Sequence, residues 1–176
     1  MVQRYRRAPT SKSPKQPNQQ KSDPWAYLML LLRYRPRSIA EARQRMTEQG
    51  FDHDMIEAAI QQAVATDQLD DAAFAKLWVR DRMWHHPLSR AAISQELRGK
   101  GIHPDLISGT LSSEYPAVRE IELATGLAEE RIRRIRGISP DKRRNRLMAF
   151  LARRGFSQNL IYQVVKTVEK DLDHDD

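Results

Sequence analysis

The chain contains no cysteine, which excludes disulfides, thiolate metal sites and thiol catalysis. Long apolar runs are also missing. The mean hydropathy is −0.70, and no segment approaches the roughly 20 continuous apolar residues that a membrane helix needs. The longest apolar block, residues 25–32, runs directly into Arg33 without a small-residue cleavage site, so we do not expect a signal peptide. These absences favour a cytoplasmic protein without membrane contact.

Motifs that would indicate an enzyme or a metalloprotein are absent as well. There is no HExxH pair, and residues 98–101 (RGKG) lack the spacing and the Ser or Thr of a phosphate-binding loop. The five histidines do not form a ligand set. Asp70 and Asp71 could suggest a metal site, but they stand at the start of an apolar run, where acidic residues cap a helix. We therefore expect neither catalysis nor a metal or other cofactor.

Positive charge is concentrated in two segments of this chain, whose net charge is +7. Residues 1–23 carry six bases and one acid, and their polar composition predicts a disordered basic arm. Residues 131–154 carry ten bases and one acid. The end of the chain has the opposite sign, and residues 171–176 are predicted to form an acidic tail. Charge this one-sided is costly unless an anionic partner offsets it, so the pattern indicates a polyanion or an acidic protein face as partner.

A threefold internal repeat organises the rest of the chain. A shift of 51 residues superposes Ser38 on Ser89 and Gly50 on Gly101, and a further shift of 54 brings Gly155 into register. Apolar residues between these markers recur at helical spacing. The repeat therefore predicts three units, at residues 24–68, 69–115 and 116–170.

Each unit is predicted to contain a helix, a glycine turn and a second helix, preceded by an opening helix at about residues 25–34, 71–84 or 116–136. Ser38 and Ser89 are expected as N-caps, Ser38 forming a capping box with Glu41, and Ser139 before a proline as the third cap. The turn glycines take a left-handed conformation. The apolar residue after each glycine is expected to fold back on the helix, and the pairs are Phe51 with Met46, Ile102 with Leu97, and Phe156 with Leu151. The predicted fold is all-α, an elongated array of three tandem three-helix repeats with about nine helices, each unit packing mainly on its neighbours.

Several short segments follow one another in a characteristic order. They are residues 33–41 with 50–51 (GF) in the first unit, residues 69–71 (LDD), 74–75 (FA), 78–82 (WVRDR) and 100–102 (KGI) in the second, and residues 150–156 (FLARRGF) in the third. Together they resemble the signature segments of the RecX family, over about residues 25–170. The resemblance implies a regulatory protein that binds the RecA–DNA filament and inhibits the ATPase, coprotease and strand-exchange activities of RecA.

The resemblance and the charge pattern also indicate the binding residues and partners. We expect a monomer that binds single- and double-stranded DNA weakly and without sequence preference. In the most basic segment the bases alternate with apolar residues that face a core, which leaves the cations for a shared surface. The candidate RecA- or DNA-binding residues are Arg33, Arg35, Arg37, Arg80, Arg82, Lys100, Arg131, Arg133, Arg134, Arg136, Lys142, Arg143, Arg144, Arg146, Arg153 and Arg154.

Two questions stay open at this point. Trp78 is expected in a core, whereas Tyr34 and Trp84 could either pack or stack on bases. The alternative function is a non-enzymatic DNA-binding protein whose helix-turn-helix-like pairs enter a groove. Tight, sequence-specific binding to DNA alone would distinguish that protein from a filament regulator.

Overall fold

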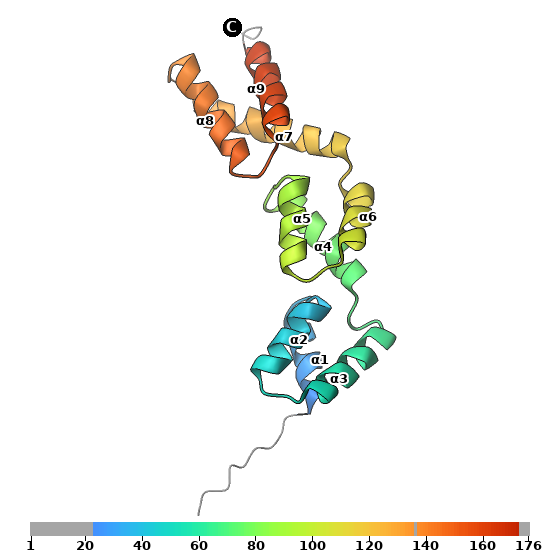
Figure 1. Ribbon diagram of the computed structural model, residues 1–176. Coiled ribbons are helices and arrows are strands. Elements are labelled where there is room, and N and C mark those ends of the chain that lie inside the picture. Colours follow the sequence, from blue (N-terminus) through green and yellow to red (C-terminus); the bar gives the residue numbers. More distant parts are fainter. Residues whose placement is uncertain (1–22, 136, 173–176) are drawn as a thin grey trace, which may run out of the picture.

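The computed structural model describes residues 23–135 and 137–172, and all of its regular structure in these ranges is helical (Figure 1). The predicted basic arm, apart from Asp23, the candidate Arg136 and the end of the predicted acidic tail lie outside the described residues. The nine helices of the described ranges are α1 (Pro24–Tyr34), α2 (Ile39–Glu48), α3 (His53–Ala65), α4 (Asp71–Trp84), α5 (Arg90–Gly99), α6 (Pro104–Glu114), α7 (Ala117–Arg134), α8 (Pro140–Ala152) and α9 (Gln158–Leu172).

The helices form three groups that follow one another along a column, with α1–α3 at one end and α7–α9 at the other (Figure 1). The predicted all-α, elongated array of tandem three-helix units is therefore confirmed. The third opening helix is shorter than predicted, because α7 ends at Arg134. Ile135 leaves the helix at φ −112° and ψ 46°, and Gly137 then adopts a positive φ of 77°.

Serine side chains start the second helix of the first two units. The Ser38 hydroxyl accepts a hydrogen bond from the Glu41 amide, and the Ser89 hydroxyl accepts one from the Ala92 amide, both at 3.1 Å. Only this half of the expected capping box forms, because the Glu41 carboxylate binds Arg35 and Lys100. Ser139 precedes α8, but its side chain makes no capping hydrogen bond.

The second helix of every unit ends in the same glycine turn. Gly50, Gly101 and Gly155 have positive φ angles of 88°, 77° and 83°, a region in which glycine alone avoids a steric penalty. The amide of the following residue then donates back to the carbonyl five positions earlier, as in a Schellman motif. These bonds join Phe51 to Met46 at 3.3 Å, Ile102 to Leu97 at 3.1 Å, and Phe156 to Leu151 at 3.4 Å.

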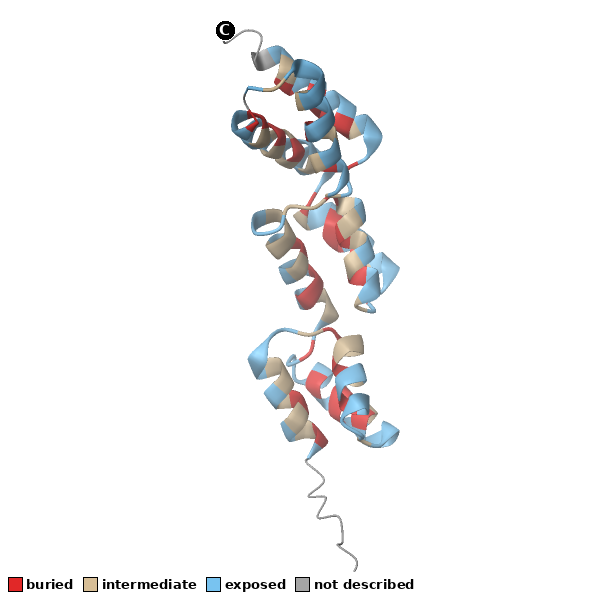
Figure 2. Cartoon of the chain, turned by 90° about the vertical axis from the view of Figure 1, so that its left-hand side faces the viewer, coloured by how far each residue is buried: buried red, intermediate tan, exposed pale blue. Residues whose placement is uncertain are grey.

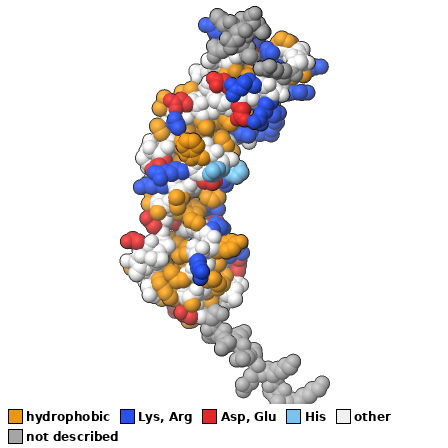
Figure 3. Space-filling view, turned by 180° about the vertical axis from the view of Figure 1, so that it is seen from behind, with side chains coloured by type: hydrophobic (Ala, Val, Ile, Leu, Met, Phe, Trp, Pro, Cys, Tyr) orange, Lys and Arg blue, Asp and Glu red, His pale blue; other side chains and the backbone are white. Residues whose placement is uncertain are grey.

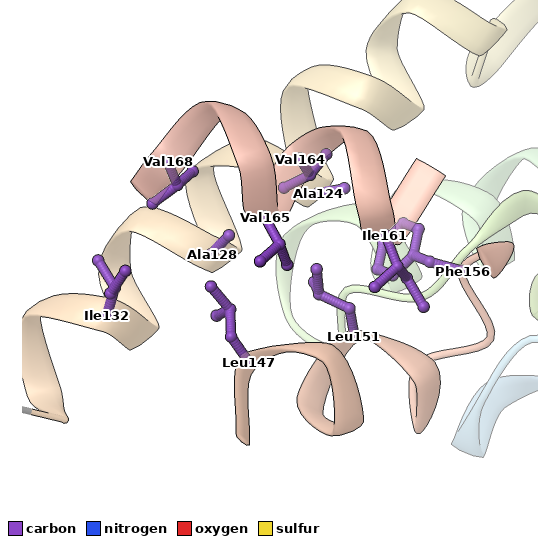
Figure 4. Packing of buried hydrophobic residues seen from close by; sticks show 10 residues of the cluster. All are labelled: Ala124, Ala128, Ile132, Leu147, Leu151, Phe156, Ile161, Val164, Val165 and Val168. Atoms are coloured by element: carbon purple, nitrogen blue, oxygen red, sulfur yellow. The ribbon is translucent and has the colours of Figure 1, made fainter. Parts of the chain in front are cut away.

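Each unit has its own hydrophobic core. The first cluster extends from Leu28 to Leu69 and the second from Phe74 to Tyr115. The third joins Ala124, Ala128 and Ile132 of α7 to side chains of α8 and α9 that point toward them (Figure 4). Buried residues accordingly lie inside each group of helices (Figure 2). The expectation that each unit packs mainly on its neighbours is wrong, because three short helices with one apolar stripe each already close a core.

The hydrogen bonds at the junctions between units repeat the same arrangement. At the first junction the Ser38 hydroxyl donates to the Lys100 carbonyl at 2.6 Å. At the second, the Ser89 amide donates to the Arg154 carbonyl at 3.0 Å. In both cases the start of a second helix meets the residue before the turn glycine of the following unit, and both serines are buried. The junctions thus depend on backbone groups presented by helix starts and turns.

A carboxylate from the following unit completes each junction. Asp71 of α4 accepts a hydrogen bond from the Ile39 amide at 2.9 Å, and Glu120 of α7 accepts one from the Arg90 amide at 2.8 Å. Ile39 and Arg90 are the first residues of α2 and α5, whose amides have no partner within their own helices. An acidic side chain also suits the positive end of a helix dipole. Each junction therefore orients one unit on the next through a helix N-terminus.

Candidate binding surface

The candidate cations of the first two units mostly bind acidic side chains of the protein itself. Arg35 and Lys100 both contact Glu41, Arg80 contacts Glu114 at 2.8 Å, and Arg82 contacts Glu96 at 2.7 Å and Asp81 at 2.7 Å. Arg33 is exposed, and no described residue pairs with it. Arg37 is half-buried, and its guanidinium donates to the Leu31 carbonyl at 3.5 Å. Burial and the neighbouring Arg35 lower the pKa of Arg37.

Trp78 is the centre of the cation cluster in the second unit. Its ring is half-buried and stacks on Phe74 with centroids 5.7 Å apart, so the expected core position holds only for one side of the ring. The Arg82 guanidinium carbon lies 4.3 Å from the ring centroid and Lys100 Nζ lies 4.1 Å from it. The indole N–H donates to Glu96 Oε2 at 2.8 Å. We therefore assign Arg82 and Lys100 to internal links in this unit.

Glu41 connects this cluster to the first unit. Lys100 Nζ lies 2.8 Å from Glu41 Oε1, and Arg35 Nη1 lies 3.2 Å from Glu41 Oε2. Burial raises the pKa of the Glu41 carboxyl, but the hydrogen bonds from Lys100 and Arg35 outweigh it and leave the pKa below its usual range. The Lys100 ion pair thus links the second unit to the first, and Arg35 binds the same carboxylate from within the first unit.

The third unit carries most of the candidate cations that have no acidic partner among the described residues. Two candidates there are paired: Arg134 binds Glu130 within α7, and Arg144 binds Glu169 of α9 at 2.8 Å. The unpaired candidates of this unit are Arg131, Arg133, Lys142, Arg143, Arg146, Arg153 and Arg154. We call them the unpaired basic cluster. Figure 3 shows many Lys and Arg side chains on the upper part of the molecule, where this unit lies.

Arg131 of α7 and Arg154 after α8 meet at Phe150. The Arg154 guanidinium carbon lies 3.9 Å from the Phe150 ring centroid and that of Arg131 lies 5.3 Å from it. Burial, followed by the charges of Arg153 and Arg131, lowers the pKa of Arg154. The Nε of Arg131 is buried and has no hydrogen-bond partner. Two guanidinium groups on one ring, with no acidic partner among the residues that the structure describes, are suited to bind an oxyanion.

The two aromatic residues whose environment the sequence left open are on the surface. The exposed fractions are 86% for Tyr34 and 72% for Trp84, so neither ring belongs to a core. Both end an opening helix, α1 in one unit and α4 in the next. Their faces are available to a partner.

Two hollows, which sequence reasoning missed, lie at equivalent places in successive junctions. Shifting α4 by 49 residues superposes Leu77, Trp78 and Asp81 on Gly126, Leu127 and Glu130 of α7. Aligning the opening helices would have revealed this correspondence. The first hollow is lined by Arg35, Pro36, Phe74, Leu77, Trp78 and Asp81, and the second by Met83, Trp84, Pro87, Arg119, Glu122, Leu123, Gly126, Leu127 and Glu130.

No helix within residues 23–135 and 137–172 is long and apolar enough to cross a membrane. In the same ranges no three His, Asp or Glu side chains come together in a way that could hold a metal ion. Asp70 caps α4 by accepting the Ala72 amide at 2.7 Å, and Asp71 binds the Ile39 amide. Both aspartates are therefore engaged with backbone amides at helix N-termini.

Comparison with known proteins shows matches along most of the chain. Residues 70–111 match a family model described as the second three-helix domain of RecX, and residues 119–165 match the third. A regulatory protein RecX from Mycobacterium avium (strain 104) is 36% identical over 141 residues, which cover 80% of this chain and 81% of that protein. One from Mycobacterium leprae (strain Br4923) is 39% identical over 137 residues, 77% of this chain and 79% of that protein.

Solved structures agree with the fold. The crystal structure of RecX from Lactobacillus salivarius superposes with a TM-score of 0.73 at 22% identity, covering 84% of this chain and 96% of that one. A second crystal structure, of a regulatory protein RecX, gives a TM-score of 0.70 at 26% identity, covering 82% of this chain and 71% of that one.

Proposed function

Because this chain belongs to the RecX family of regulatory proteins, we propose that it binds the RecA–DNA filament and inhibits the ATPase, coprotease and strand-exchange activities of RecA. In this proposal the protein is a monomer that acts by binding the filament and catalyses no reaction. The family and the all-helical fold are consistent with a protein that is not an enzyme.

The periodic build of the molecule is the observation that carries this proposal. A filament presents the same subunit surface again and again along its axis. This protein presents the same junction twice along its own axis, each time with a hollow that combines apolar, arginine and acidic side chains. Exposed Leu77 and Trp84 line these hollows, and exposed aromatic and apolar side chains in such places are typical of protein interfaces.

DNA contacts play a supporting part in this proposal. The unpaired basic cluster can neutralise backbone phosphates, and such contacts are independent of sequence and sensitive to salt. Binding to free DNA is then weak and non-specific, while the protein contacts select the filament.

The alternative of groove insertion by helix-turn-helix-like pairs has less support. Recognition helices bring cations and polar side chains to DNA, but α3 and α6 contain no lysine or arginine. A side chain in place of Gly101 or Gly155 would run into the preceding unit, which leaves little room for DNA at these corners.

The test is the ATPase activity of RecA on single-stranded DNA, titrated with this protein at several DNA concentrations. We expect inhibition at amounts well below one per RecA protomer, because one bound molecule interferes with many subunits of a polymer. The inhibition should persist as DNA is added. If extra DNA relieves it, the protein merely competes for DNA and filament docking is excluded.

A pair of charge-reversal variants adds a matched control. Arg133→Glu with Arg153→Glu changes two exposed residues of the unpaired basic cluster. Arg45→Glu with Arg98→Glu changes net charge equally at exposed positions in the first two units. We expect the first variant to lose more inhibition than the second. Equal losses would show that only net charge matters.

A further inference from the structure

The second and third units hold the same pair of cations in the same places. The shift of 49 residues between α4 and α7 places Arg82 on Arg131, and the shift of 54 between the turn glycines places Lys100 on Arg154. In each unit both cations lie over one aromatic ring, at distances of 4.1 and 4.3 Å in the second unit and 3.9 and 5.3 Å in the third. The two pairs of cations are therefore related by the repeat, whereas the rings come from different helices, Trp78 from α4 and Phe150 from α8.

In the second unit three carboxylates neutralise the pair, one of them Asp81, which binds the adjacent Arg82 at 2.7 Å. Glu96 binds Arg82 at 2.7 Å, and Glu41 of the preceding unit binds Lys100 at 2.8 Å. Both cations over the Trp78 ring therefore have carboxylate partners. This arrangement links the two units and leaves no unpaired cation to attract an outside ligand.

Around the pair of the third unit, apolar residues occupy the positions of Glu96 and Glu41, and the position of Asp81 holds Glu130, which binds Arg134. The shift of 54 residues replaces Glu96 by Phe150, and the shift of 51 replaces Glu41 by Ala92. No acidic side chain of the described residues pairs with Arg131 or Arg154. The same two cations thus remain without counter-charges, and Phe150 supplies the ring on which they lie.

We propose that Arg131 and Arg154 form a clamp for a backbone phosphate of nucleic acid. The Phe150 ring orients the two guanidinium groups, whose planar forks can each give a phosphate two hydrogen bonds. The proposal rests on the function proposed above and deepens it, because it assigns the contact through which the protein reaches the DNA of the filament.

The surroundings of the clamp favour a nucleic acid over an acidic protein. Arg153 directly precedes Arg154 in the chain, and the rest of the unpaired basic cluster lies on α7 and α8. A phosphate backbone carries a charge at every nucleotide, so it can satisfy the clamp and the neighbouring cations in succession. A protein face would have to supply an unbroken series of carboxylates to do the same.

The test restores the second unit's charge balance in the third. Phe150→Glu places a carboxylate where Glu96 stands in the repeat, and Phe150→Gln is the control, with the same size and no charge. Binding to a fluorescent oligo-dT is measured by anisotropy over a range of salt concentrations. For Phe150→Glu relative to Phe150→Gln, we expect about tenfold weaker binding near 0.1 M salt and a salt slope lower by about one. Equal binding by the two variants overturns the clamp.

A second pair of variants covers the case in which substitution at Phe150 unfolds the unit. Arg154→Gln removes one arm of the clamp, and Arg80→Gln removes the same charge from an arginine already paired with Glu114. Circular dichroism shows whether each variant is folded. Weaker binding by Arg154→Gln alone supports the clamp, and equal binding by both variants overturns it.

Competition experiments separate the sources of the anion. Inorganic pyrophosphate and oligo-dT should both compete for the wild-type protein, and a poly-glutamate peptide of equal charge should compete far less. One outcome would overturn the nucleic-acid assignment in favour of a protein ligand. In that outcome poly-glutamate binds the wild-type protein as tightly as oligo-dT does, and it binds Phe150→Glu much more weakly. The RecA ATPase assay remains independent. If wild type inhibits RecA while Phe150→Glu and Phe150→Gln bind DNA equally, the clamp fails and the proposed function stands.

Discussion

Replacing Gly155 by alanine tests the junction between the second and third units. Gly155 has a φ of 83°, and a β-carbon there would lie 2.8 Å from the Ser89 hydroxyl oxygen and 2.9 Å from the Ala92 β-carbon. Gly50 is the matched control. Its φ is 88°, but a β-carbon there meets nothing within 4 Å.

The two variants are expected to differ in unfolding free energy only through the contacts that a β-carbon makes at Gly155. Both substitutions force alanine into the left-handed region, which costs about 1 kcal/mol. At Gly155 the two close contacts must also be relieved by moving α5 against the turn, and overpacking of this kind costs about 1–3 kcal/mol. Ser89 caps α5 and is buried, so displacing it adds up to about 1 kcal/mol. We expect a loss of about 1 kcal/mol for Gly50→Ala and about 2–5 kcal/mol for Gly155→Ala.

Urea denaturation followed by circular dichroism measures both variants against the wild-type protein. The double variant Gly155→Ala with Ala92→Gly removes one of the two contacts. It should therefore be more stable than the sum of the single changes allows. If Gly50→Ala and Gly155→Ala lose the same stability, the junction does not need glycine for close approach, and the close packing of the turn on α5 is contradicted.

Three further predictions concern charge and burial. Glu41→Gln should destabilise the protein at neutral pH. Because the folded pKa of Glu41 is depressed, its contribution is complete above the ordinary value of 4.5 and is lost as the pH falls through the folded pKa. Urea midpoints of Glu41→Gln and wild type should therefore converge in acid, and a constant difference would contradict the ion pairs. Tyr115→Phe should cost about 1–2 kcal/mol in urea melts, because the buried hydroxyl donates to the Leu88 carbonyl at 3.1 Å; a neutral change would show that this bond contributes nothing. Arg146→Gln should lower the salt slope of DNA binding more than Arg144→Gln, since Arg144 already binds Glu169; anisotropy titrations showing equal slopes would count against this distinction.

Local structure could be predicted from the sequence because its causes are local. A serine hydroxyl reaches an amide three residues away, and a glycine turn closes on a carbonyl five residues earlier, so the markers Ser38, Ser89 and the three turn glycines indicated where the helices begin and end. Their repetition at fixed intervals indicated three units, and the order of the signature segments indicated the family. The reciprocal half of the capping box was not predicted correctly. The Glu41 carboxylate binds two cations that are distant in sequence, because hydrogen bonds between charged groups are stronger than a bond to a neutral amide.

The partners of the charged side chains were decided only by the tertiary structure. Arg80 binds Glu114, which is 34 residues away in the sequence, and Arg144 binds Glu169, which is 25 residues away. No periodicity in the sequence predicts these ion pairs. Charge alone made all sixteen candidate cations look equivalent. The fold divides them, since a cation beside a carboxylate is neutralised within the protein, whereas a cation whose repeat-related carboxylate position holds Phe150 or Ala92 keeps its charge for a partner. The sequence by itself determined how many positive charges the protein has and where along the chain they stand. Only the packing of one unit against the next decided which of them are left uncompensated, because a side chain is neutralised by what lies near it in space.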